Sequence, residues 1–74
     1  MTNIRNQKLL KKFGAHVRKL REDAEMSQED LAIEANISIS QVGRIERGEI
    51  NTTLSTAEVL AKALGVELSA LTQF

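Results

Sequence analysis

Residues 38–49, SISQVGRIERGE, combine small side chains with positive charge on what the spacing predicts to be a helix. With 100° between successive residues, Val42 and Ile45 share one side of that helix. The other side carries Ser40, Gly43 and Arg47, flanked by Ile39 and Arg44. In the major groove of DNA, an arginine can donate two hydrogen bonds to guanine, a serine can bond to a base edge, and an aliphatic side chain can contact a thymine methyl group. The pattern therefore favours DNA base contacts, although each of these residues taken singly also suits an ordinary surface position.

Two capped helices separated by a tight turn are predicted to carry this stretch. Ser27 is a good N-cap, and Asp30 three residues later gives a near capping box. Asn36 tolerates the left-handed backbone that ends a helix, and Ser38 with Gln41 makes a second capping box directly after it. Because the turn between the helices is about three residues long, the layout is that of a helix-turn-helix.

Helical spacing dominates the whole chain. It has no proline, and no alternation of apolar and polar residues persists. In the first helix, Phe13, Val17, Leu20 and Ala24 form a stripe that faces a core, and Gly14 lies inside the helix at some cost in propensity. The fold class that we expect is all-α, with five helices at roughly 7–24, 28–36, 39–47, 54–64 and 68–72.

Length and composition exclude several classes of protein. The 74 residues suffice for one domain. There is no cysteine and His16 is the only histidine, so neither a disulfide framework nor a protein-only metal site is expected. Since no nucleophile–base pair or glycine-rich phosphate loop is visible, we expect no enzyme and no cofactor. No apolar run approaches about 18 residues and no signal-peptide pattern opens the chain, which favours a soluble cytoplasmic protein.

The formal net charge is zero, but the charges are unevenly distributed. The first 21 residues hold seven of the ten basic residues and none of the ten acidic residues. Such a region can meet a polyanion, but it equally fits a lysine-rich solvated helix. Residues 1–12 include four of these bases: Arg5, Lys8, Lys11 and Lys12. This segment is therefore either a basic arm on DNA or an extension of the first helix, and we favour the extension.

Three separated motifs, SQEDLA, NISISQVGRIERGE and LAKALGV, resemble the Cro and phage-repressor type of bacterial helix-turn-helix domain, the Xre-like family. The resemblance covers roughly Phe13 to Leu71 and implies a lambda-repressor-like DNA-binding domain over residues 13–72, with the third helix in the major groove. The base readers that it implies are Ile39, Ser40, Gly43 and Arg44. The phosphate contacts that it implies are Gln28, Ser38, Arg47, Asn51, Thr52 and Thr53. Helix capping alone explains the two threonines equally well.

The resemblance also implies a structural ion pair between Arg21 and Glu46, which would tie the first helix to the third. Relatives commonly have glycine where Glu25 and Asn36 stand, so Glu25 is expected in a strained conformation or at a differently ended helix. The loop EINTT lacks the proline and the basic residues that are often found there, and Glu49 would repel phosphate if it pointed inward.

The function that the resemblance implies is that of a small transcriptional repressor or autoregulator. We expect it to bind double-stranded DNA as a homodimer on a palindromic operator, with no small-molecule effector evident. Leu68, Leu71 and Phe74 form the expected dimer surface, because they are hard to bury together under so short a helix. The alternative is a C-terminal helix folded back on its own core. The rival function is a protein-interaction module of the antitoxin or anti-repressor type, with DNA binding secondary.

Overall fold

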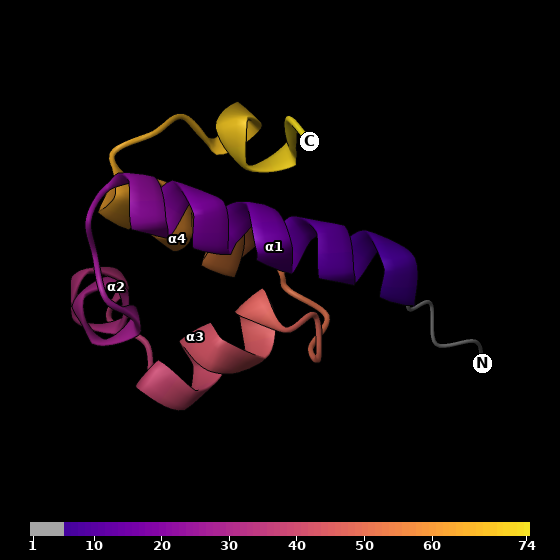
Figure 1. Ribbon diagram of the computed structural model, residues 1–74, viewed down its shortest axis with the longest axis horizontal. Helices are drawn as coiled ribbons and strands as arrows, with labels where there is room; N and C mark the ends of the chain where they lie inside the picture. The colour runs from indigo at the N-terminus through magenta and orange to yellow at the C-terminus, as the bar shows by residue number, and fades with distance from the viewer. Residues whose placement is uncertain (1–5) are drawn as a thin grey trace.

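The computed structural model describes residues 6–74, a part of the chain that is helical and contains no strand. Its elements are α1 (Gln7–Asp23), α2 (Gln28–Ala35), α3 (Ile39–Glu46), α4 (Leu54–Leu64) and the 3₁₀ helix η1 (Leu68–Thr72), as Figure 1 shows. The all-α prediction is confirmed. The expectation of five α-helices is wrong, because the last segment closes little more than one turn and takes the tighter hydrogen bonding common in such short pieces. Arg5 and its neighbours in residues 1–5 lie outside the described residues.

The helix ends follow from local capping. Ser27 and Asp30 form a full capping box, in which the Asp30 backbone N–H donates to Ser27 Oγ and the Ser27 backbone N–H donates to Asp30 Oδ2, both at 2.9 Å. The second predicted box is only half formed: Ser38 Oγ accepts from the Gln41 backbone N–H at 3.0 Å, without the return bond among the described residues. Asn36 ends α2 in the left-handed region with φ 57°.

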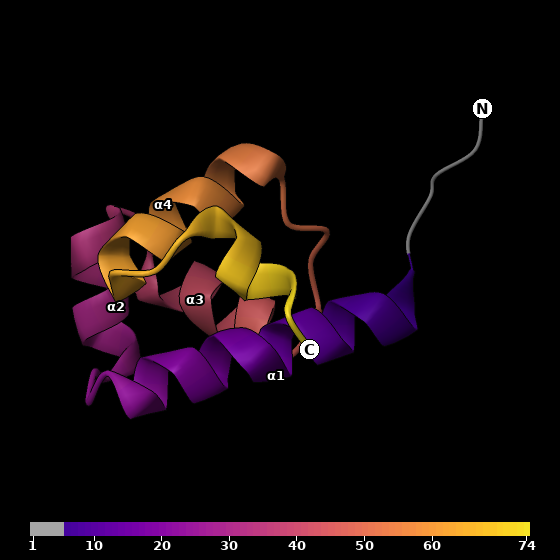
Figure 2. The same ribbon diagram turned by 90° about the horizontal axis from the view of Figure 1, so that it is seen from above.

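One hydrophobic core joins all five elements. Its fully buried large side chains are Val17, Leu31, Val42, Ile45, Leu60 and Leu71. Figure 1 shows α1 running over α3, with α2 seen nearly end-on at one side, and Figure 2 shows η1 lying over α4 and beside α1. Since α3 packs its inner side on α1 and α2, its outer side remains on the surface. None of the helices in the described part of the chain is long and apolar enough to cross a membrane.

Gly14 is the point at which α1 and α3 come closest. A methyl group added to Gly14 would lie 2.6 Å from the Glu46 carbonyl oxygen and closer still to that of Ile45. Real side chains do not tolerate such distances to a rigid backbone, so only glycine lets the two helices approach in this way. The loss of helix propensity at Gly14 is therefore offset by the packing of the C-terminal turn of α3.

The C-terminal segment folds back on the core of the domain. Leu71 is fully buried in the core, so the expectation that it contributes to a dimer surface is wrong. His16 Nε2 donates to the Ala70 carbonyl oxygen at 2.7 Å, and its ring centroid lies 5.6 Å from that of Phe74. These contacts hold η1 against α1. Leu68 is 36% exposed and Phe74 51% exposed, so apolar surface remains on this segment without Leu71.

Candidate nucleic-acid interface

Helix α3 has one buried side and one exposed side, as the helical spacing predicts. Val42 and Ile45 are 1% exposed and face the core. Ile39, Ser40 and Arg44 are exposed on the other side, with Ile39 at the first residue of the helix. Residues 36–38 form the turn that joins α2 to α3, and Ser38 is the N-cap of α3. The structure thus brings three of the four predicted base readers together on one exposed face.

Gly43, the fourth predicted base reader, is not part of that open surface. It is buried, because the Arg47 side chain lies across its outer side. A methyl group added to Gly43 would lie 2.9 Å from Arg47 Nη1. Gly43 therefore does not share the uncovered surface of the other three predicted base readers. Helical spacing put Gly43 on the correct side of α3 but gave no information about where the long side chain four residues later would lie.

Arg44 and Arg47 differ in their partners although they are three residues apart on the same helix. Among the described residues, no hydrogen bond or ion pair engages the Arg44 side chain, which is exposed. Arg47 is paired with Glu49 just beyond the helix, with 2.6 Å between Arg47 Nε and Glu49 Oε2. This hydrogen bond, and then the nearby negative charge, raise the pKa of Arg47 above its ordinary value. Arg44 is thus the guanidinium of α3 that is available to an acceptor from outside the protein.

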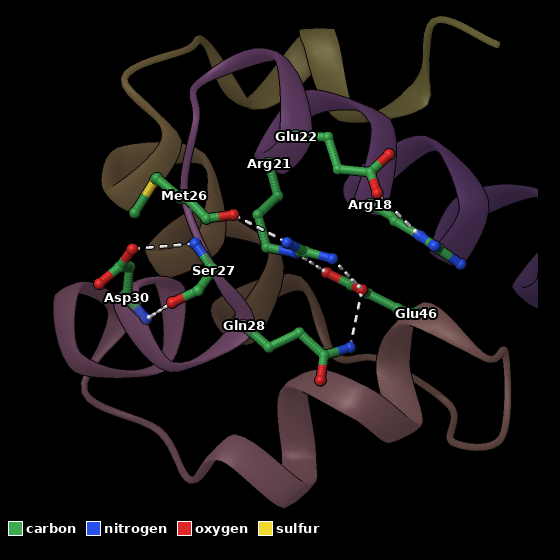
Figure 3. A network of polar contacts seen from close by, with 8 residues as sticks. All are labelled: Arg18, Arg21, Glu22, Met26, Ser27, Gln28, Asp30 and Glu46. Carbon is green, nitrogen blue, oxygen red and sulfur yellow. Dashed lines mark hydrogen bonds and ion pairs between the residues drawn. The ribbon is translucent and has the colours of Figure 1, made fainter.

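A buried ion pair anchors the C-terminal turn of α3 to α1 (Figure 3). Arg21 Nε donates to Glu46 Oε2 at 2.7 Å and Arg21 Nη2 donates to Glu46 Oε1 at 3.1 Å, with side chains that are only 10% and 3% exposed. The hydrogen bond to Glu46 raises the pKa of Arg21, against the opposing effect of burial. Arg21 Nη1 also donates to the Met26 carbonyl oxygen at 2.7 Å. The structure therefore brings together the two residues expected to pair, and it adds a backbone acceptor.

Gln28, at the first residue of α2, belongs to the same network. Its Nε2 donates to Glu46 Oε1 at 3.0 Å, and the side chain is half-buried (Figure 3). An amide nitrogen carries two hydrogens, and this bond uses one of them. The second hydrogen is left to donate to an acceptor such as a phosphate oxygen, in a position that Glu46 fixes relative to α3.

The segment between α3 and α4 holds three more of the residues expected at phosphate, Asn51, Thr52 and Thr53. Thr53 is the N-cap of α4, where its Oγ1 accepts from the Thr56 backbone N–H at 3.1 Å. Thr52 Oγ1 is buried and has no hydrogen-bond partner among the described residues, whereas Asn51 is exposed. The first turn of α4 presents backbone N–H groups and the positive end of the helix dipole, which together favour an anion. Ser38 lies exposed at the opposite end of α3 as its N-cap.

The N-terminal half of α1 lies against this segment. Gln7 Nε2 donates to the Gly48 carbonyl oxygen at 3.1 Å, and a methyl group added to Gly48 would lie 2.8 Å from Lys11 Cα. Residues 7–12 are part of α1. The exposed bases Lys8, Lys11 and Lys12 are thus carried on a helix that is tied to the end of α3.

Four residues with clear structural roles were missed or underrated in the sequence. Gly14 was treated only as a propensity cost, His16 only as the single histidine, and Gln7 and Glu49 were given no partner. Each of them either contacts a residue that is distant in sequence or lies in a loop itself. The sequence held one usable signal: an acid two residues after Arg47, separated from it by a glycine that can reverse the chain.

A helix-turn-helix family model matches residues 17–71. The chain belongs to this helix-turn-helix family. The control protein C.BamHI of Bacillus amyloliquefaciens is 43% identical over 75 aligned residues, which cover 100% of this chain and 88% of that protein. The immunity repressor of Bacillus phage phi105 is 40% identical over 58 residues, which cover 78% of this chain but only 40% of the repressor. The chain therefore spans less than half the length of that relative.

Solved structures agree with the family. The restriction-modification controller protein C.AhdI from Aeromonas hydrophila is similar with a TM-score of 0.82 and 39% identity, over 89% of this chain and 98% of that one. The family match and these relatives support a DNA-binding transcriptional regulator, which is the function that the Xre-like resemblance implies.

Proposed function

We propose that this chain is a DNA-binding transcriptional regulator that represses its targets or regulates its own gene in the cytoplasm. It reads the major groove of double-stranded DNA with α3. The observation that carries this proposal is the exposed side of α3, where Ile39, Ser40 and Arg44 lie and where Arg44 has no polar partner among the described residues. A guanidinium that is held by no acid can donate two parallel hydrogen bonds to guanine.

Phosphate contacts on both sides of α3 would fix its register on the duplex. Gln28 has one amide hydrogen left over from its bond to Glu46, and Ser38 lies at the start of α3. At the other end of the helix, Arg47 is the C-cap of α3, and Asn51, Thr52 and Thr53 directly precede α4. Such contacts position the protein and carry no sequence information by themselves. Residues 7–12, as a helical extension of the domain of residues 13–72, add lysines beside this segment.

A single small domain makes few contacts, so we propose that the protein binds a palindrome as a homodimer with half-sites about one helical turn apart. Leu68 and Phe74 supply exposed apolar surface on the C-terminal segment. Phe74 also lines an apolar groove together with Leu9 and Leu54, which are both exposed. Exposed apolar residues that gather in this way favour burial against a second copy. Leu71 takes no part, since it is a core residue.

Binding to DNA enriched from a random pool tests the proposal, with fluorescence anisotropy measured over a series of salt concentrations. About six to eight phosphate contacts per dimer predict a slope of log K against log salt of about −5 to −7. The enriched sequences should also show two related half-sites. An absence of salt-sensitive binding at low salt would instead favour the rival function, an interaction module of the antitoxin or anti-repressor kind.

Arg44→Ala tests base readout within the same assay. We expect it to weaken binding to the enriched site by about 1–3 kcal/mol and to reduce discrimination at one base pair. Lys62→Ala is the matched control, because it removes one exposed positive charge from the last turn of α4 instead of from α3. If Arg44→Ala weakens binding equally on every sequence, Arg44 contacts phosphate and does not read a base.

A further inference from the structure

Arg47 is held at the end of α3 by the chain that follows the helix. The Gly48 backbone N–H donates to the Ile45 carbonyl oxygen at 3.0 Å, and the Glu49 backbone N–H donates to the Arg44 carbonyl oxygen at 2.9 Å. With Gly48 in the left-handed region at φ 71°, these two bonds form a Schellman motif. The motif turns the chain back toward the helix and places the Glu49 carboxylate beside the Arg47 guanidinium.

The carboxylate meets one edge of the guanidinium with both of its oxygens. Arg47 Nε donates to Glu49 Oε2 at 2.6 Å, and Arg47 Nη2 donates to Glu49 Oε1 at 3.4 Å. The remaining nitrogen, Nη1, lies over Gly43. A phosphate engages a guanidinium in the same forked manner. In the free protein, therefore, Glu49 occupies the edge of Arg47 that a phosphate would use, and the Arg47 side chain covers Gly43.

The Arg47–Glu49 pair is much more exposed than the Arg21–Glu46 pair. The Arg47 and Glu49 side chains are 58% and 48% exposed, so water can hydrate both charges when they separate. Exposed pairs of this kind contribute little to stability and can be exchanged for another partner. A DNA phosphate, with its higher charge density along the duplex, is an acceptor that can replace the carboxylate.

We propose that Glu49 stands in for a DNA phosphate on Arg47 in the free protein, and that binding exchanges the carboxylate for a phosphate and uncovers Gly43. This inference rests on the proposed function, since it needs DNA as the partner. Glu49 then lowers the affinity for DNA without contacting the DNA, because it keeps the Arg47 guanidinium paired in the free protein. Its role is more specific than repulsion, because it acts through the Arg47 side chain.

A double-mutant cycle of wild type, Glu49→Gln, Arg47→Gln and the double variant tests the exchange on the enriched duplex. Glu49→Gln should tighten binding by about two- to five-fold, which is the range that an exposed ion pair provides. Arg47→Gln should weaken binding and make the salt slope shallower by about 0.9 per protomer, the value for one lost phosphate contact. In the Arg47→Gln background, Glu49→Gln should give a clearly smaller gain, because the side chain that Glu49 holds has been removed.

Glu22→Gln is the control for net charge. It removes an acid from the exposed pair of α1 in which Arg18 Nε lies 3.2 Å from Glu22 Oε2, and it should leave DNA affinity within two-fold of wild type. An equal gain from Glu49→Gln with and without Arg47 would overturn the proposal in favour of simple repulsion. An unchanged salt slope in Arg47→Gln would overturn it as well, because Arg47 would then meet no phosphate. Either result leaves the proposed function standing if wild type binds, whereas an absence of wild-type binding removes both.

Discussion

Two arginine–glutamate pairs meet at the C-terminal turn of α3, with nearly equal distances and very different surroundings. Arg21 Nε lies 2.7 Å from Glu46 Oε2, and Arg47 Nε lies 2.6 Å from Glu49 Oε2. The first pair is almost fully buried, whereas about half of each side chain in the second is exposed. Distance alone therefore does not distinguish a structural pair from an exchangeable one, but burial does.

The polar contacts around each pair follow from that difference. The buried guanidinium also donates to the Met26 carbonyl oxygen, and the buried carboxylate also accepts from Gln28, so the protein supplies bonds that water cannot. A charge removed from water needs this full set of partners, because an unpaired buried charge is costly. The Arg47 and Glu49 side chains are exposed to water, so their charges remain hydrated. One pair thus locks α1, α2 and α3 together, whereas the other is the pair that we propose to exchange.

The largest effect that we predict comes from changing the carboxylate of the buried pair. Glu46→Gln should lower the free energy of unfolding by about 3–5 kcal/mol, because Arg21 keeps its charge in a buried site without an anion. Glu49→Gln is the same chemical change in the exposed pair and should leave the urea midpoint close to that of wild type. Equilibrium urea unfolding, followed by far-UV circular dichroism, measures both. Similar midpoints for the two variants would contradict the distinction by burial.

A smaller effect is expected from moving the helices that the buried pair connects. Gly14→Ala places a methyl group against the Ile45 and Glu46 carbonyl oxygens, so α1 must shift away from the turn that carries Glu46. Overpacking of this kind costs about 1–3 kcal/mol, which exceeds the gain in helix propensity of up to about 1 kcal/mol. Ala15→Gly is the control for propensity, since Ala15 is exposed on the same helix. If Gly14→Ala raises the urea midpoint, the close approach does not require glycine.

Local rules predicted the helices well. Capping residues and helical spacing placed α2 and α3 within a residue of their bounds, because these signals lie within a few residues of the element that they define. The pairing of Arg21 with Glu46 followed from resemblance to a family. Neither burial nor the contribution of Met26 and Gln28 to that pair was accessible from spacing along the chain.

The sequence failed where long side chains and tertiary packing decide the outcome. Gly43 was placed on the correct side of α3, but the position of the Arg47 side chain above it depends on a loop acid and a Schellman turn. Leu71 was expected on the surface because a short helix buries little by itself. It is buried because η1 packs on both α1 and α4, which is a property of the assembled domain.

The smallest effect that we predict concerns a third carboxylate, that of Asp30. It shows what exposure does to a carboxylate whose partner is a backbone N–H group instead of an arginine. Asp30 is exposed, like Glu49, but its oxygen accepts from the Ser27 backbone N–H. This hydrogen bond, followed by that from the Ser27 side chain, lowers the pKa of Asp30 in the folded protein. Its stabilising contribution is therefore present above the ordinary aspartate pKa of about 3.9 and is lost as the pH falls through the lower folded value.

Asp30→Asn should accordingly lower the urea midpoint at neutral pH by a small amount and reduce the loss of stability on acidification, so that the two proteins converge in acid. The physical reason is that the unfolded wild-type chain binds a proton at Asp30 at a higher pH than the folded chain does. Urea midpoints measured from pH 7 down to about pH 2 test this, with Glu34→Gln as the control, because Glu34 is an exposed acid of α2 outside the capping box. Parallel curves for Asp30→Asn and wild type over the whole range would show that an exposed carboxylate held by backbone N–H groups behaves like an unpaired one.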